Sequence, residues 1–223
     1  MVLTGMLTPT VTLLAFTTVS DGAESTQLSV FAGAITLAVL FETQNKVASN
    51  FSFMRQTGAL DFFGSLPLRR EALIVGTAAA FFLLAVPAVV VTTAVGWTML
   101  DVTISLQPLW LVPFVLAIAV FTGLGAIIGS MSSSIEQSSS ISLGATVLLT
   151  SAGPVIIDPG RLPDWLNVVG YVNPAALGSD SLRAALTGTH VYDGAWVITM
   201  LSVATIAVWL LVGFLMPWRG RRQ

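Results

Sequence analysis

The feature that most limits the possible folds of this chain is the length of its uncharged apolar segments. No Asp, Glu, Lys or Arg occurs between Ala72 and Leu100, and the segment Pro108–Ser130 is also free of charge. A helix of about 20 apolar residues is long enough to cross the hydrocarbon core of a bilayer. Only 9% of the residues are charged, whereas soluble domains carry about 25%. The sequence therefore predicts an integral membrane protein.

Six segments are predicted to cross the membrane, which makes the expected fold an all-α, polytopic membrane domain over residues 1–223. The first segment is rich in threonine and is interrupted by Pro9, and it has no basic region that would indicate a signal peptide. The predicted spans are residues 2–19, 26–45, 72–97, 108–130, 141–157 and 195–218. The fourth span offers small surfaces for close helix contacts at Gly123, Gly125 and Gly129.

The distribution of basic residues predicts how these spans are oriented. Short loops rich in Lys and Arg remain in the cytoplasm. With six spans and a cytoplasmic C-terminus, the segment 46–71, the connection 131–140 and the C-terminal tail lie inside and hold seven of the nine basic residues. The outer loops hold the other two, Arg161 and Arg183. We therefore expect a multi-pass protein of the cell membrane whose C-terminus is cytoplasmic.

The predicted cytoplasmic loop, residues 46–71, contains the pattern of a short helix. Thr57 can cap this helix, Asp61 lies favourably in its first turn, and Pro67 would end it. One side of the helix is apolar, with Leu60, Phe62 and Phe63. Two interpretations stay open: a helix that docks into a groove of a partner protein, or one that lies on the lipid headgroups.

The predicted outer segment, residues 158–193, contains two further helix patterns separated by Asn173 and Pro174. In the second pattern, Asp180 and Arg183 are three residues apart and can form an ion pair. Neither helix is long enough to cross the membrane. We favour a re-entrant hairpin that enters the outer leaflet against protein, because irregular backbone at membrane depth must be covered by protein or line a cavity. The alternative is a pair of helices lying flat on the outer surface.

Four stretches, in this order, resemble parts of the membrane subunit of ABC-2 type transporters, a permease family that includes drug and polysaccharide exporters. They are MLTPTVTLLAF at 6–16, RQTGALDFFGSLPLRREALIVG at 55–76, GSMSSSIEQSSSISL at 129–143 and RLPDWLNVVGYVNPAALGSDSLRAAL at 161–186. The last is the most specific, with Leu-Pro-x-Trp-Leu, Asn-Pro and a closing Leu-Arg. The chain departs from the family pattern in two places. It lacks the amphipathic helix before the first span, so we expect residues to be missing upstream. Its fifth span ends as TSAGPVIIDP, where the family pattern has Ser-Gly followed by a more aromatic run.

The resemblance implies a working assembly of two permeases, as a homodimer or a heterodimer, and two ATPase subunits that bind the ATP. It also implies that the short helix of the loop 46–71 is seated on the ATPase subunit. The expected ATPase-coupling residues are Phe53, Arg55, Asp61 and Phe62. The expected residues of the outer hairpin are Pro163, Trp165, Asn173, Pro174 and Arg183.

The residues present argue against catalysis by the chain itself. A phosphate-binding P-loop needs Gly-Lys followed by Ser or Thr, but the only lysine, Lys46, follows Asn45. There is no cysteine, and the only histidine is His190, which we interpret as a surface residue. Neither a Gly-x-Ser-x-Gly turn nor a metal-spaced His/Glu pair occurs. We expect no catalytic residue, cofactor or metal ligand, and no basic face for nucleic acid.

The expected function is that of the permease subunit of an ATP-driven exporter, with export taken from the resemblance. No charged residue lies at the centre of a predicted span, although such residues usually mark ion routes. This favours an amphipathic or lipid-like substrate or a drug. The alternatives are an ion-coupled secondary transporter and a membrane scaffold that transports nothing.

Overall fold

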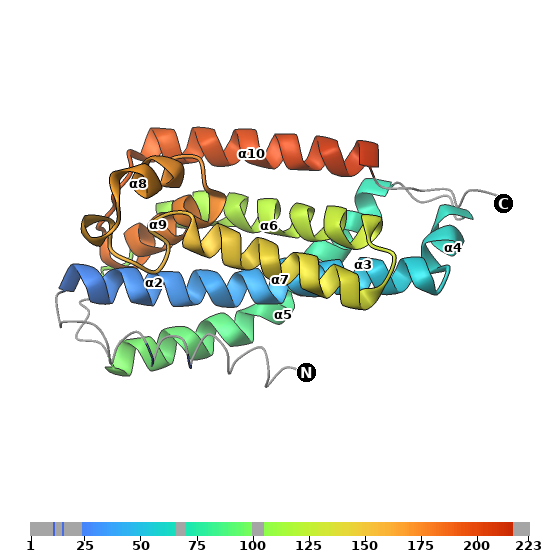
Figure 1. Cartoon of the computed structure of the whole chain (residues 1–223). Helices are drawn as coiled ribbons and strands as arrows, with labels where there is room; N and C mark the ends of the chain where they lie inside the picture. The colour runs from blue at the N-terminus through green and yellow to red at the C-terminus, as the bar shows by residue number, and fades with distance from the viewer. Residues whose placement is uncertain (1–10, 12–14, 16–23, 66–69, 100–104, 216–223) are drawn as a thin grey trace.

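The computed structural model describes residues 24–65, 70–99 and 105–215, together with Val11 and Ala15. These residues form helices joined by turns (Figure 1), so the predicted all-α architecture is confirmed for this part of the chain. The helical elements are α2 (Glu24–Leu40), η1 (Phe41–Asn45), α3 (Lys46–Gln56), α4 (Ala59–Ser65), α5 (Arg70–Met99), η2 (Pro108–Trp110), α6 (Leu111–Met131), α7 (Ile135–Ser151), η3 (Pro159–Arg161), α8 (Asp164–Gly170), α9 (Pro174–Thr187) and α10 (Gly194–Leu215).

Four helices within the described residues are long and apolar enough to cross a membrane. They are Thr26–Gln56, Val75–Thr98, Pro108–Met131 and Gly194–Leu215. They correspond to the second, third, fourth and sixth predicted spans. The first predicted span, residues 2–19, lies outside the described residues except for Val11 and Ala15.

The long helices pack around α6, which contacts α3, α9 and α10. Figure 1 shows that the short helix α4 lies at one end of this bundle and that α8 and α9 lie at the other. We call the first the α4 end; it also contains the turn between α6 and α7. We call the second the α9 end; it also contains the start of α2 and the end of α7.

The helix of the second predicted span does not stop at residue 45. It continues through the π-helical segment η1 into α3 and ends at Gln56. The sequence of α3 contains neither Pro nor Gly, and Val47 and Phe51 are buried in an apolar cluster that also contains residues of α6 and α10. At 1.5 Å per residue, the 31-residue helix Thr26–Gln56 is about 46 Å long, against a hydrocarbon core of about 30 Å. The first eleven residues of the predicted loop 46–71 are therefore a helical extension of the span.

The small residues of α6 permit this close packing, as the sequence predicted. A Cβ atom at Gly125 would lie 2.5 Å from the Gln44 carbonyl oxygen, and one at Gly129 would lie 2.9 Å from the Cβ of Phe51. Any larger side chain at either glycine would push α6 away from η1 and α3.

The fifth predicted span, residues 141–157, was displaced along the chain. Its helix, α7, begins at Ile135 because the Ser134 side chain accepts a hydrogen bond from Gln137 N and caps the helix. It ends at Ser151 and is followed by a turn in which Gly153 has φ +144°, a conformation that favours glycine. Most of the predicted polar connection 131–140 is therefore helical. With 17 residues, α7 is about 26 Å long, and it is not among the four helices that meet the criteria for a span.

Candidate functional site

The α4 end contains the short helix predicted within the loop 46–71, although its start differs from the prediction. Thr57 ends α3, where its hydroxyl donates to Phe53 O, and does not cap α4. The chain then turns at Gly58, with φ +74°, whose carbonyl accepts hydrogen bonds from the N–H groups of Asp61 and Phe62. Asp61 lies in the first turn of α4, as predicted.

Helix α4 is attached to the bundle by one apolar residue and presents another outward. Leu60 is buried in a cluster with Val47 and Phe51 of α3. Phe62 is 62% exposed, and Phe53, on α3, is 53% exposed. The Phe62 and Phe63 rings meet edge to face, with centroids 5.8 Å apart. Two exposed phenylalanines and an exposed carboxylate therefore mark the surface of this end.

Arg55, the fourth residue predicted for this surface, makes a contact that the sequence did not indicate. Its Nη1 donates to the carbonyl oxygens of Ser130, at 2.7 Å, and Ser132, at 3.2 Å. These carbonyls belong to the C-terminal end of α6, where helical partners are missing and a cation is favourable. Arg55 therefore joins α3 to the turn between α6 and α7.

The π-helical segment η1 brings a polar group of side chains into the interior of the bundle. Gln44 is fully buried, and its Nε2 donates to Ser142 O at 3.2 Å. Asn45 Nδ2 donates to Thr146 Oγ1 at 3.1 Å. Glu42 is buried and forms an ion pair with Lys46 one turn later. Sequence reasoning missed this connection to α7, although the run Glu-Thr-Gln-Asn after an apolar helix was visible; π-helical turns occur frequently at functional sites.

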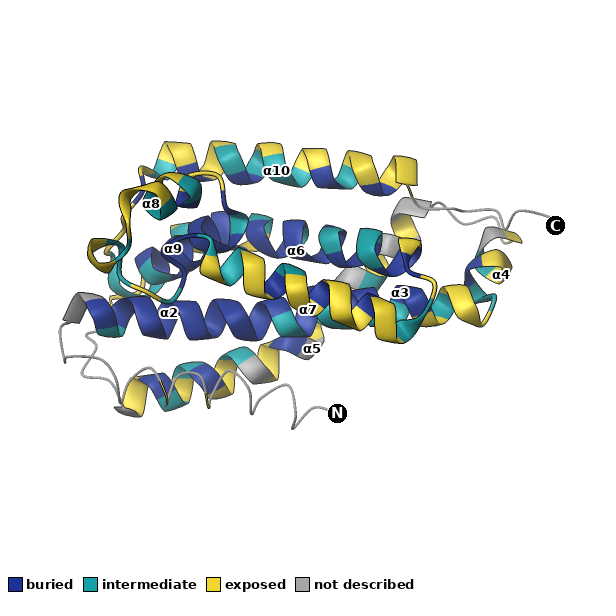
Figure 2. Cartoon of the chain, viewed as in Figure 1, coloured by how far each residue is buried: buried dark blue, intermediate teal, exposed yellow. Residues whose placement is uncertain are grey.

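The two helices of the α9 end differ in burial, as Figure 2 shows. Helix α8 is exposed, with Trp165 64% exposed and Pro163 at the position before its first turn. Helix α9 is buried among α2, α6, α7 and α10. Its packing depends on small residues: a Cβ atom at Gly178 would lie 2.9 Å from the Cβ of Ala117 on α6. The predicted division into two short helices is therefore correct.

The predicted ion pair between Asp180 and Arg183 is present. The Asp180 carboxylate also accepts hydrogen bonds from Val191 N at 2.7 Å and Tyr192 N at 3.1 Å, and so fixes the chain that leads from α9 to α10. Arg183 Nη1 donates to Ser29 Oγ of α2 at 3.2 Å. Burial of the Tyr192 phenol, together with the nearby Asp180 carboxylate, raises the pKa of Tyr192.

Asn173 and Pro174 form the start of α9. The Asn173 Oδ1 accepts a hydrogen bond from Ala175 N at 2.9 Å, which caps the helix, and Pro174 occupies the first helical position. The Asn173 Nδ2 donates to Leu149 O and Ala152 O at the end of α7, both at 2.7 Å. The break that the sequence predicted is thus also a contact between two helices.

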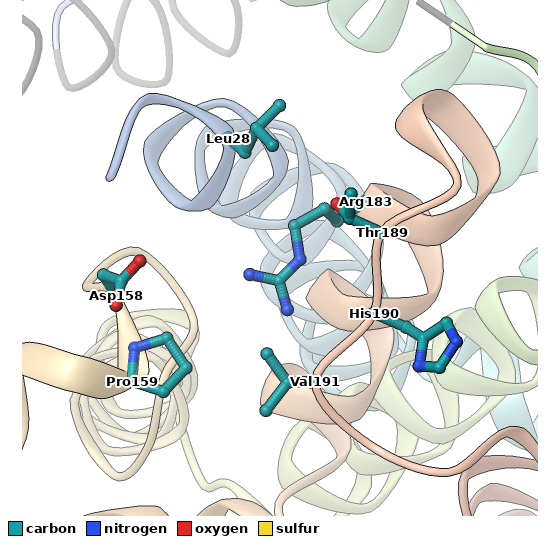
Figure 3. Close-up of a pocket in the computed structure, with 7 residues that line it drawn as sticks. All are labelled: Leu28, Asp158, Pro159, Arg183, Thr189, His190 and Val191. Atoms are coloured by element: carbon teal, nitrogen blue, oxygen red, sulfur yellow. The ribbon is translucent and has the colours of Figure 1, made fainter. Parts of the chain in front are cut away.

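A pocket of about 390 Å³ opens at the α9 end beside Arg183. Its lining residues are Leu28, Asp158, Pro159, Arg183, Thr189, His190 and Val191. Figure 3 shows the Arg183 guanidinium pointing into the space between the Asp158–Pro159 turn and Val191. The His190 ring stacks on Trp110, with centroids 5.3 Å apart. The pocket therefore combines one guanidinium and one carboxylate with apolar walls.

Within residues 24–65, 70–99 and 105–215, no three His, Asp or Glu side chains lie close enough together to hold a metal ion. The short helices at the two ends contact the long helices differently, α4 through the buried Leu60 and α9 through the hydrogen bonds of Asn173 and Arg183. No curated protein matches the chain. The family model for the ABC-2 type transporter matches residues 1–187. The chain, a multi-pass membrane protein by its apolar helices, therefore belongs to the ABC-2 type transporter family and is a permease component of an ABC transporter.

Proposed function

We propose that this chain is the transmembrane subunit of an ATP-driven exporter in the cell membrane and that a separate ATPase subunit binds and hydrolyses the ATP. The substrate is an amphipathic or lipid-like molecule or a drug. The α4 end faces the cytoplasm, as does the C-terminus. Family membership supports the pairing with an ABC ATPase. The exposed residues at the α4 end support this end as the surface on which the ATPase subunit docks.

The observation that carries this proposal is the exposure of Phe53 on α3 and of Phe62 on α4. Leu60 fixes α4 to the bundle, so the Phe62 ring remains outside. A helix lying on headgroups would also expose apolar residues, but Phe53 lies in the last turn of a helix that is about 16 Å longer than the hydrocarbon core, and Phe62 lies beyond that helix. A groove on the ATPase subunit would cover both rings, with Asp61 at its edge.

At the other end, we propose that α8 and α9 form the re-entrant hairpin. The burial of α9 among four helices supports this, because the irregular backbone before Asn173 then has protein partners at membrane depth. The pocket beside Arg183 would lie on the outer side, where an exported substrate leaves.

We also propose that the permease acts as a dimer in which a second permease covers α7. The outward side of α7 carries polar and small residues as well as apolar ones. The exposed ones are Glu136, Gln137, Ser140, Gly144 and Ser151. Such residues are better placed against protein than against lipid, where close helix contacts and interhelical hydrogen bonds favour association.

The test is co-purification of the permease with its ATPase subunit, followed by transport in reconstituted vesicles. Asp61→Lys combined with Phe62→Ala is expected to lower recovery of the ATPase subunit at least tenfold. The matched control is Phe82→Ala, an exposed phenylalanine on α5, which is expected to leave recovery unchanged. Recovery that does not change in the double variant would remove α4 from the docking surface.

The same vesicles distinguish the other functions. Substrate movement that follows a proton or sodium gradient without any ATPase subunit would indicate a secondary transporter. A complex in which no substrate stimulates ATP hydrolysis would indicate a scaffold.

A further inference from the structure

Helix α7 is attached to its own protomer by side-chain donors at two heights. In its middle, Gln44 and Asn45 donate to Ser142 and Thr146. At its end, Asn173 donates to Leu149 and Ala152. The first attachment comes from the long helix that reaches the α4 end, and the second comes from α9.

The attachment at the end of α7 uses both sides of one buried amide. Asn173 is 5% exposed. Its oxygen caps α9, and its nitrogen binds two carbonyl oxygens at the end of α7, at 2.9 and 2.7 Å respectively. The last carbonyls of a helix have no helical partner, so this amide satisfies groups that a shift between α7 and α9 would leave unpaired. The start of α9 must therefore follow the end of α7.

Little else in the protomer holds α7 on its outward side. Ile141, Leu143, Val147 and Leu148 are all exposed. Within its own chain, α7 therefore has close-packed neighbours on one side, the side that carries its polar attachments. Its polar attachments then determine which of its neighbours move with it.

We propose that α7 is the strut that transmits a displacement of the α4 end to the outer hairpin and that Asn173 is the positioning residue that joins the strut to α9. This inference rests on the proposed function, because the displacement arises when the ATPase subunit binds nucleotide. Gln44 and Asn45 couple α7 to the helix that carries the docking surface, and Asn173 passes the movement on to the helix that lines the Arg183 pocket.

A single fluorescent label can test this, since the chain has no cysteine. Thr189 is exposed and lines the pocket just beyond α9. The Thr189→Cys permease is labelled with an environment-sensitive dye, placed in lipid nanodiscs and combined with the ATPase subunit. The measurement is the change in dye emission when ATP is added, compared at equal nucleotide occupancy.

The variant to test is Asn173→Ser. Serine caps a helix about as well as asparagine, but its side chain is one atom shorter and cannot make both contacts with α7. We expect the emission change to fall at least fivefold while the permease still co-elutes with the ATPase subunit. The matched control is Asn167→Ser, because Asn167 Nδ2 donates to Pro159 O inside the hairpin and not to α7; its emission change is expected to equal that of the wild type.

A second variant, Asn173→Asp, covers the case in which the serine variant does not fold. It keeps the cap and loses the donor, so the same fivefold loss is expected. A full emission change in either Asn173 variant, within a complex that hydrolyses ATP, would overturn this inference alone. A wild-type permease that binds no ATPase subunit would overturn the proposed function and this inference with it.

Discussion

The helices α4 and α9 are both short, both follow a break in the chain, and both carry an acidic residue in a partly apolar sequence, yet they lie in opposite environments. Helix α9 is rich in Ala, Gly and Ser, so α6 and α2 approach it closely and bury it. Helix α4 carries two adjacent phenylalanines, of which one is buried in part and the other is exposed. The comparison shows that side-chain size, more than apolar content, decides which short helix joins the interior and which remains available to a partner.

The prediction with the largest expected effect replaces the acidic residue of each helix, Asp180 of α9 and Asp61 of α4, one at a time. Asp180→Ala leaves the partly buried Arg183 and the N–H groups of Val191 and Tyr192 without their buried carboxylate. Breaking a buried ion pair by removing one partner costs about 3–5 kcal/mol, so the thermal unfolding midpoint in detergent should fall by many degrees. Asp61→Ala, at an exposed position in the first turn of α4, should change stability by no more than about 1 kcal/mol. Equal losses in the two variants would contradict the difference in burial.

A smaller effect on stability is expected for two apolar residues of α4, Leu60 and Phe62, which we expect to have different roles. Leu60→Ala removes the buried attachment of the helix and should destabilise the α4 end by about 2 kcal/mol, the low end of the range for buried leucines. Phe62→Ala should leave stability almost unchanged and lower the affinity for the ATPase subunit. Hydrogen exchange of residues 59–65, with and without the ATPase subunit, measures both. The opposite pattern, with Phe62 stabilising and Leu60 contributing to affinity, would mean that α4 turns over when it docks.

The prediction with the smallest expected effect compares the stability of glycine-to-alanine variants at one position in α6 and one in α7. Gly129→Ala on α6 would place a Cβ atom 2.9 Å from the Phe51 Cβ and should cost about 1–2 kcal/mol through overpacking. Gly144→Ala on α7 meets nothing within 4 Å and should stabilise the helix by up to about 1 kcal/mol. Unfolding midpoints of the two variants give the comparison. A loss of stability or of dimer in Gly144→Ala would place a second chain directly against that glycine.

The sequence predicted those elements that local rules determine. Uncharged apolar runs form helices because a helix satisfies its own backbone hydrogen bonds inside the bilayer. The pair Asn173-Pro174 ends one helix and starts another because asparagine caps a helix and proline fits the first helical position. Elements that depend on distant partners were missed. Nothing in residues 46–56 shows that they extend a span, because that depends on burial of Val47 and Phe51 against other helices. The direction of Arg55 depends on carbonyls 75 and 77 residues away.

The residues of the candidate site also fall into two groups: those that the sequence indicated and those whose contacts depend on distant helices. Phe53, Asp61 and Phe62 were expected from the family resemblance, and all three are exposed. The attachment of α7 by Gln44 and Asn45 was not predicted, because a polar run near the end of a span looks the same whether it faces headgroups or another helix. Only the packing of η1 against α7 distinguishes the two.

The π-helical segment η1 also sets the angular phase of everything that follows it in the same helix. One extra residue in a turn rotates all later side chains by about 100° relative to a regular α-helix. Arg55 and Phe53 therefore point in their present directions only because Phe41–Asn45 is wound more widely. Deleting a single residue there would keep the helix intact and turn its α3 half away from α6, so in this stretch the spacing of the residues matters as much as their identity.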